Sequence, residues 1–243
     1  MTRSEPPPRR SALRFLLPIL TCALILGVLQ AAEPVPEPER PEPRLPAGLA
    51  QGWYAVIETS FGTIIARLLP EQAPQSVAHF AAIAEGRLSW IDPLTGQTKQ
   101  GHYYDGLRVH LAVAAQRFET GDPTGTGRGY PLIYVPPEGK GPITFDAPGR
   151  LGMTRSSLGR ISGVQFFATA SALPWLIGHH PCFGEIVSGS EVVSAIAGVK
   201  TKTNGRPETP VIIERLRIRK VGEPAPLPDP VPFVPKPPEF GLK

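Results

Sequence analysis

A short stretch of the chain combines side chains that can hold a small apolar ring and place one polar group beside it. Gln165, Phe166 and Phe167 are consecutive within the β-type sequence of residues 163–169. Successive side chains of a strand face opposite ways, so Gln165 and Phe167 share one face while Phe166 faces the core. We therefore expect an outward pocket with an aromatic wall and an oriented amide. The alternative is that these aromatic residues only fill the core.

The residues that follow extend this pocket. Trp175 contributes an indole N–H donor, Leu176 adds apolar surface and His180 adds an imidazole, all within residues 172–180. A mainly apolar lining with a few placed polar groups is typical of a binding site for a small organic group.

The order of these residues resembles the second half of the cyclophilin family of peptidyl-prolyl isomerases. The matching motifs are Gly-Val-Gln-Phe-Phe, Trp-Leu-x-Gly-x-His and the Phe-Gly pair at residues 183–184. Residues 73–80 are similar to the family's first helix, and residues 104–106 and 121–129 are similar to its central hairpin and glycine-rich loop. The resemblance implies a mainly β fold over residues 49–221, a closed eight-stranded antiparallel barrel capped by two helices.

The family's reaction is rotation about the peptide bond that precedes proline. The barrier is about 20 kcal/mol because rotation breaks the amide resonance. A catalyst lowers this barrier by binding the twisted amide more tightly than either planar form, which requires no cofactor, metal or covalent step. In cyclophilins a guanidinium hydrogen-bonds the twisted prolyl unit, apolar walls hold the ring and a glutamine holds the peptide backbone.

Part of the family's site is replaced in this chain. Aligned on the Gly-Asp pair that begins the glycine-rich loop, His110 falls on the family's histidine, but Leu111 falls on its catalytic arginine. Gln116 replaces the phenylalanine of the family's pocket, Arg117 replaces its methionine, and Glu119 replaces its glutamine. The opposite wall keeps the family's residue types at Gln165, Phe167, Trp175, Leu176 and His180.

These replacements predict reduced activity. Leu111 has no donor, and loss of one preorganised donor to a transition state costs about a hundredfold or more in rate. Replacement of a phenylalanine by Gln116 removes about 1–3 kcal/mol of apolar burial from the ring pocket.

Arg117 is our candidate for the missing guanidinium, with His110 as the second catalytic residue. Arg117 and Glu119 are two residues apart on one strand, so they share a face and can instead simply pair with each other. A group displaced by one side-chain position also tends to miss the required geometry. Arg155 is a second candidate, with a solvated surface charge as its alternative. The expected substrate-binding residues are Gln165, Phe167, Trp175, Leu176, His180, Gln116 and Glu119.

Other chemistries find little support in the sequence. The adjacent His179 and His180 would diverge on a strand or loop, and no third metal ligand is evident. Cys22 and Cys182 are the two cysteines of the chain and do not have zinc-ligand spacing. The glycine-rich residues 121–129 lack the Lys-Ser/Thr pair and the helix of a phosphate-binding loop.

Strands and loops that position these residues follow from alternation and turn residues. Strands are predicted at residues 53–59 and 62–69, a polar loop at residues 88–101 and a closing strand at residues 211–221. The inward residues of the closing strand are expected to be Ile212, Leu216 and Ile218.

Two helices are predicted, at residues 70–86 and 190–197. The inward residues are Val77, Phe80 and Ala84 in the first helix, and Val192, Val193 and Ile196 in the second.

The two ends of the chain differ from its middle in composition. Residues 1–14 form a basic n-region, and the apolar residues 15–32 that follow predict a signal anchor or a signal peptide. An uncleaved anchor is favoured because Gln30 stands where a cleavage site needs a small residue. Residues 33–48 are a proline-rich linker, and residues 222–243 are a proline-rich tail.

Charge and targeting together suggest the partners. The net charge of +4 arises from 25 basic and 21 acidic residues, without a basic stripe that would indicate nucleic acid. The basic n-region should stay in the cytoplasm, which places the domain in the periplasm or another extracytoplasmic space, anchored to the membrane. One hypothesis is a peptidyl-prolyl isomerase acting on proline-containing segments of exported proteins. The other is a non-catalytic cyclophilin-like scaffold or accessory subunit that docks onto a membrane protein complex.

Overall fold

The structure is a computed structural model that describes residues 41, 43–129, 133–156 and 159–231. The chain divides into a unit of residues 1–42 and a unit of residues 43–243, and the elements below belong to the second. The predicted n-region, the apolar segment, most of the linker and the end of the tail lie outside the described residues. Within the residues that are described, no helix has the length and apolar character needed to cross a bilayer.

Strands make up most of the regular structure. In chain order the elements are β1 (Gly52–Thr59), β2 (Gly62–Leu68), α1 (Pro74–Ala84), β3 (Trp90–Ile91), β4 (Thr98–Lys99), β5 (Leu111–Val113), β6 (Arg117–Thr120), β7 (Tyr134–Val135), β8 (Arg150–Arg155), β9 (Ile161–Thr169), the 3₁₀ helix η1 (Pro174–Leu176), β10 (Cys182–Ser188), α2 (Ser190–Ala197) and β11 (Ile213–Val221). The first two predicted strands are confirmed, and α2 has its predicted bounds.

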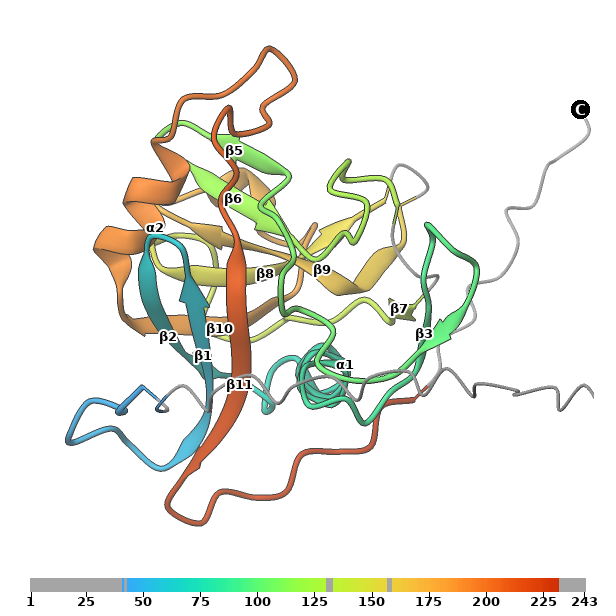
Figure 1. The fold of residues 1–243 in the computed structure, drawn as a ribbon. Helices are drawn as coiled ribbons and strands as arrows, with labels where there is room; N and C mark the ends of the chain where they lie inside the picture. The colour runs from blue at the N-terminus through green and yellow to red at the C-terminus, as the bar shows by residue number, and fades with distance from the viewer. Residues whose placement is uncertain (1–40, 42, 130–132, 157–158, 232–243) are drawn as a thin grey trace, which may run out of the picture. The chain divides into compact units, whose positions relative to one another are not determined.

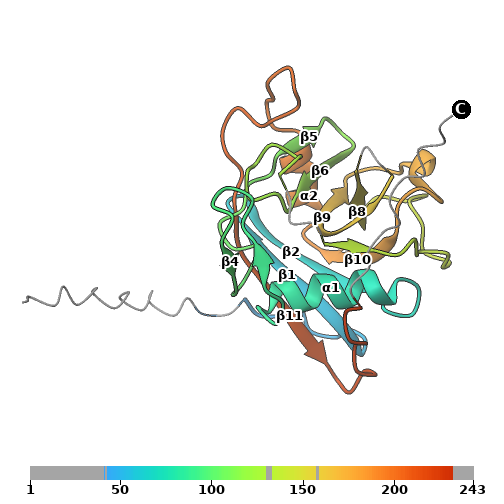
Figure 2. The same cartoon turned by 90° about the vertical axis from the view of Figure 1, so that its right-hand side faces the viewer.

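One antiparallel sheet curls around the core in the order β11-β1-β2-β10-β8-β9-β6-β5, with β7 paired to β9. Helix α1 packs against β9 and β11, and α2 packs against β2 and β6, as Figures 1 and 2 show. The prediction of a mainly β, antiparallel fold with two helices is confirmed, and the sheet is curled into a half-barrel. The predicted closure is only partial, because no ladder joins the edge strands β5 and β11 in the described residues. The segments just before these two strands meet instead, through the isolated bridge Arg108–Ile212 and the hydrogen bond from Val109 N–H to the carbonyl of Val211.

Aromatic side chains from three elements fill the core. Phe80 of α1 meets Phe166 of β9 edge-on, with ring centroids 5.3 Å apart, and lies 5.0 Å from Phe183 of β10. All three rings are fully buried, which stabilises the fold by about 1.5–3 kcal/mol for each side chain. Phe166 therefore faces the core as predicted.

Helix α1 begins later than predicted. Pro74 occupies the first helical turn, where its missing N–H costs nothing. The N–H groups of Gln75 and Ser76 donate to the carboxylate of Glu138, at 2.9 and 2.8 Å. A residue distant in sequence thus accepts the hydrogen bonds of the free N–H groups in the first turn, and the local sequence pattern could not reveal this. The predicted inward residues Val77, Phe80 and Ala84 are buried.

The predicted inward face of the closing strand is wrong at one end. Strand β1 pairs Glu58 with Arg215 but Thr59 with Ile213, so the register shifts by one residue. This bulge changes the alternation, and Ile213 rather than Ile212 is buried. Leu216 and Ile218 lie in the core as expected.

Residues 88–101, predicted as a polar loop, contain the small sheet of β3 and β4. Trp90 pairs with Lys99, and its ring packs edge-on against Tyr103 with centroids 5.0 Å apart. Strands of two residues are too short to produce a visible alternation in the sequence.

Candidate functional site

Three neighbouring strands carry the candidate residues in register. Leu111 of β5 pairs with Glu119 of β6, and Glu119 pairs with Phe167 of β9. Paired residues share a face of a sheet, so these three side chains lie on one side, opposite the core residue Phe118. Arg117, two residues before Glu119 on β6, lies on the same side.

Gln165 and Phe167 face away from the main core as predicted, but they are buried rather than open. Their exposed fractions are 3% and 1%. The ring of Phe167 lies 5.3 Å from that of Phe145, which covers it from residues outside the sheet. Phe167 therefore forms the floor of the site within a second apolar cluster, whose buried members are Phe145, Phe167, Leu173, Leu176 and Cys182.

The amide of Gln165 has a donor with no partner. Its Oε1 accepts a long hydrogen bond from the hydroxyl of Thr154, at 3.4 Å, whereas its buried Nε2 finds no partner among the described residues. A buried donor left unsatisfied costs about 1–3 kcal/mol. The backbone carbonyl of a bound peptide would supply the missing acceptor.

His180 is held as a neutral, oriented ring. Its Nδ1 donates to the backbone oxygen of Met153 at 2.9 Å, and its ring stands edge-on to Phe167 with centroids 5.4 Å apart. Burial lowers the pKa of His180 from its ordinary value, and the hydrogen bond to Met153 offsets only part of this effect. The second nitrogen therefore carries a lone pair at neutral pH.

Arg117, Glu119 and His110 form a polar cluster at one side of the floor. The Nε of Arg117 donates to Glu119 Oε1 at 2.9 Å, and His110 Nε2 lies 3.8 Å from Glu119 Oε2. Burial raises the pKa of Glu119, but its interactions with His110 and Arg117 outweigh this, so that the net shift is downward. The guanidinium carbon of Arg117 lies 5.9 Å from the ring centre of Phe167.

Leu111 and Gln116, the other two replaced residues of β5 and its hairpin turn, are engaged in packing and backbone hydrogen bonds. The side chain of Leu111 packs against the loop at Gly205, where an added Cβ would approach its Cδ1 to 2.4 Å. Gln116 lies at the hairpin turn, where its N–H donates to Val113 and its carbonyl accepts from Ala170. Leu111 has no side-chain donor, and the hydrogen bonds recorded for Gln116 in the described structure are those of its backbone.

Trp175 and Arg155 lie at the periphery. Trp175, on η1, is 58% exposed, so its indole lies on the surface rather than in the buried cluster. Arg155 donates to the carbonyl of Gly159 at 2.8 Å and reaches that of His179 at 3.5 Å. The positive charge of Arg155 nevertheless helps to lower the pKa of His180, which places it close to the site.

The sequence does not identify two residues that shape the candidate site, Phe145 and Asp122. Phe145 lies outside any regular element and carries no periodic signal, although it covers Phe167. Asp122, at the start of the glycine-rich loop, accepts hydrogen bonds from the N–H groups of Thr124, Thr126, Gly127 and Gly129 and so orders that loop. That loop approaches His110 at Gly127, where a Cβ would lie 3.0 Å from the imidazole.

The described residues offer little to metal or thiol chemistry. They contain no group of three or more potential metal ligands. Cys182 is buried, and burial raises the pKa of its thiol to about 12, so it is protonated at neutral pH and unreactive.

Comparisons with known proteins agree on one family. A family model for cyclophilin type peptidyl-prolyl cis-trans isomerases matches residues 54–218. Peptidyl-prolyl cis-trans isomerase B of Streptomyces anulatus is 37% identical over 171 residues, which are 68% of this chain and 96% of the relative. Peptidyl-prolyl cis-trans isomerase A of Mycobacterium tuberculosis H37Rv is 35% identical over 166 residues, with 68% and 91% covered.

Solved structures show the same relationship. A cyclophilin-type isomerase of Cryptosporidium parvum, crystallised in the presence of the dipeptide Ala-Pro, superposes with a TM-score of 0.58 at 26% identity. The match covers 69% of this chain and 99% of that structure.

Proposed function

Because the chain belongs to the cyclophilin-type peptidyl-prolyl cis-trans isomerase family, we propose that it catalyses rotation of X-Pro bonds above Phe167, with reduced activity. The observation that carries this proposal is the position of Arg117. Its guanidinium carbon lies 5.9 Å from the centre of the Phe167 ring, although the family's arginine position is occupied by Leu111. Strand β6, which neighbours β9, thus places the guanidinium of Arg117 near the ring of Phe167.

The roles of the other residues follow from their surroundings. Phe167, Leu176 and the edge of His180 offer apolar surface for a prolyl ring. The unpartnered Nε2 of Gln165 donates to a backbone carbonyl of the peptide. These contacts hold both planar forms of the substrate, so they position it without favouring the twisted amide by themselves.

Arg117 supplies the interaction that is specific to the twisted amide. As the bond rotates, the prolyl nitrogen loses conjugation and its lone pair becomes a hydrogen-bond acceptor. A donor aimed at that nitrogen stabilises the twisted form and no bond is made or broken. In the described structure the recorded hydrogen bond of Arg117 uses Nε, which leaves its Nη groups to donate to the substrate.

Reduced activity is expected because Glu119 competes for the same guanidinium. The 2.9 Å bond to Glu119 fixes Arg117 on the β6 side, one strand away from the family's arginine position at Leu111. Rate falls steeply when a catalytic group is displaced by about 1 Å.

The proposed setting is outside the cytoplasm, on proline-containing segments of exported proteins. The support is the sequence of residues 1–32, a basic segment followed by an apolar one. A reporter enzyme that is active only outside the cytoplasm, fused after residue 231, should be active. An inactive fusion would contradict this setting.

The catalytic assignment is tested by a protease-coupled assay on an Ala-Pro peptide. We expect Arg117→Ala to lower kcat/KM about a hundredfold. Arg155→Ala should have a small effect, since its recorded contacts are to the carbonyls of Gly159 and His179. Arg87→Ala is the matched control, because Arg87 pairs with Glu85 at the end of α1, away from the site. Equal activity of Arg117→Ala and the wild type would overturn the role of Arg117.

Leu111→Arg tests whether the site retains the family's geometry. The new arginine would place a donor at the family's catalytic position, which should raise kcat/KM at least tenfold if the floor binds proline and Glu119, which lies opposite, does not hold the guanidinium. An inactive wild type that becomes active with Leu111→Arg would favour the alternative, a non-catalytic accessory subunit that binds proline-containing segments. The packing of Leu111 against Gly205 is the observation that supports this alternative.

A further inference from the structure

Residues 222–231 of the proline-rich tail lie on a surface of the domain that includes none of the site residues around Phe167. The tail continues from β11 with prolines at every second position from Pro224 to Pro230, and it is described as far as Val231. In Figure 1 this segment runs from the end of β11 back towards α1.

Burial along the tail repeats every third residue. Pro224, Leu227 and Pro230 are half-buried, whereas the residues between them are exposed. A polyproline II helix has three residues per turn, so one side of such a helix faces the domain. Leu227 on this side packs against the main hydrophobic core.

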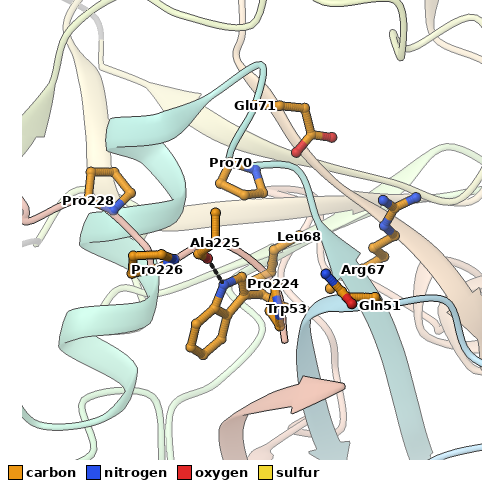
Figure 3. Close-up of a pocket in the computed structure, with 11 residues that line it drawn as sticks. Gln51, Trp53, Arg67, Leu68, Pro70, Glu71, Pro224, Ala225, Pro226 and Pro228 are labelled. Atoms are coloured by element: carbon orange, nitrogen blue, oxygen red, sulfur yellow. Dashed lines mark hydrogen bonds between the residues drawn. The ribbon is translucent and has the colours of Figure 1, made fainter. Parts of the chain in front are cut away.

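Two side chains of the domain donate hydrogen bonds to the backbone of tail residues 223–225. The amide of Gln51 donates to the carbonyl of Glu223 at 2.7 Å, and the indole N–H of Trp53 donates to that of Ala225 at 2.9 Å. Figure 3 shows Trp53 beneath the tail with this bond drawn. A polyproline II helix makes no internal hydrogen bonds, so its carbonyls are available to such donors.

Helix α1 binds residues 229–231 of the tail. Gln75 accepts the N–H of Val231 at 2.8 Å and donates to the carbonyl of Asp229 at 3.3 Å. His79 Nε2 donates to the carbonyl of Val231 at 2.9 Å. Every one of these contacts involves the tail backbone, so they recognise the extended conformation rather than particular side chains.

The tail does not fill the surface that it covers. A cavity of about 420 Å³ remains between the tail and the strands beneath it. Its lining is shown in Figure 3 and includes Trp53, Arg67, Glu71, Ala225 and Pro226. A segment with a larger residue in place of Ala225 would make contacts here that the tail does not make.

We propose that Gln51, Trp53, Gln75 and His79 form a second peptide-binding site, the tail groove, separate from the isomerase site. Its ligand class is a polyproline II segment with an apolar residue at every third position. The chain's own tail occupies the groove in cis, and such a segment of another polypeptide occupies it when it displaces the tail. No residue of the tail groove belongs to the site around Phe167, so the inference does not depend on catalysis.

Binding of a labelled peptide with the sequence of residues 223–231 to the full-length chain tests this proposal by fluorescence anisotropy. The tethered tail competes at an effective concentration of about 1 mM, so the wild type should bind the free peptide weakly. Leu227→Asp in the chain removes the apolar contact of the tail and should tighten binding of the wild-type peptide about tenfold. A peptide carrying the same Leu227→Asp change should bind about tenfold more weakly.

Variants of the groove then locate the peptide. In the Leu227→Asp chain, Trp53→Phe and Gln75→Ala should each weaken binding about fivefold, as expected for a lost hydrogen bond. Gln75→Ala keeps helix α1 intact, so it remains informative if Trp53→Phe destabilises the fold. The matched change Trp175→Phe, at the isomerase site, should leave binding unchanged. Loss of binding with Trp175→Phe but not with Trp53→Phe, or equal binding by the wild-type and Leu227→Asp chains, would overturn the proposal.

Discussion

At the residue scale, the amide of Gln165 links the stability of the fold to its proposed use. Its Nε2 is buried without a partner among the described residues, and a buried donor of this kind destabilises the free protein. The same donor is available to a peptide carbonyl. In the function we propose, this donor contributes to peptide binding at the expense of the stability of the unliganded fold.

Gln165→Leu should separate these two effects. We expect the free energy of unfolding to stay constant or rise by about 1 kcal/mol, because the unsatisfied donor is removed. Activity should fall about fivefold, since one hydrogen bond to the peptide is lost. Urea unfolding and the isomerase assay on the same variant measure both quantities.

Gln72→Leu is the matched control for this experiment. The amide of Gln72 bonds to the carbonyls of Ile143 and Cys182, at 3.0 and 2.8 Å, so its loss should destabilise the fold by about 2 kcal/mol. If Gln165→Leu destabilises as much as Gln72→Leu, the amide of Gln165 is satisfied in the free protein and our interpretation is wrong.

At the element scale, the β5–β6 hairpin carries Leu111 and Arg117 on its two strands. Its turn includes Ala115, which adopts a left-handed backbone with a φ of 57°. This conformation is costly for a residue with a Cβ and favourable for glycine.

Ala115→Gly should therefore raise the free energy of unfolding by about 1 kcal/mol. Ala114→Gly, next to it in the same turn, should give no such gain, because Ala115 is the described non-glycine residue with a positive φ. Thermal unfolding of both variants measures the difference. Glycine raises the entropy of the unfolded chain and so lowers stability by itself, which means that a gain from both substitutions would contradict the assignment to Ala115.

Most elements could be predicted from the sequence, and the failures share a physical cause. Periodicity placed α2 and the first two strands because their inward faces repeat regularly. It misplaced the start of α1 and the inward face of β11, where Glu138 and a β-bulge intervene from elsewhere in the fold. These determinants are tertiary, so a local pattern does not contain them.

The candidate site shows the same division. Motif order identified Phe167 and His180, and their proximity is confirmed by the 5.4 Å between their rings. Phe145 was missed because it reaches Phe167 from an irregular segment. Trp175 stays a predicted substrate-binding residue, and its 58% exposure places its side chain at the surface, which the motif alone did not specify.

At the scale of the whole molecule, the buried His79 and the half-buried His180 make stability depend on pH. Burial lowers the pKa of both His79 and His180, although their hydrogen bonds to Val231 and Met153 oppose this. The unfolded chain then binds protons more readily than the folded chain as the pH falls below about 6.5. Their contribution to stability is complete above that pH and is lost as the pH falls towards the lowered values.

We therefore expect the free energy of unfolding to be lower at pH 5.5 than at pH 7.5. Urea unfolding at the two pH values measures the difference, and His180→Gln should reduce it. The lowered pKa values of Glu119 and Asp122 act at more acidic pH and do not enter this interval. Equal stability at pH 5.5 and 7.5 would contradict the prediction.

The carboxylate of Glu138 joins the first turn of α1 to an irregular segment more than 60 residues further along the chain. The two parts therefore open together, as one cooperative unit, when the protein fluctuates. In a hydrogen-exchange experiment the amide protons of Gln75 and Ser76 would report the release of Glu138 rather than fraying of a helix end. Any partner that draws the Glu138 segment away would loosen the same turn of α1 whose Gln75 binds the tail.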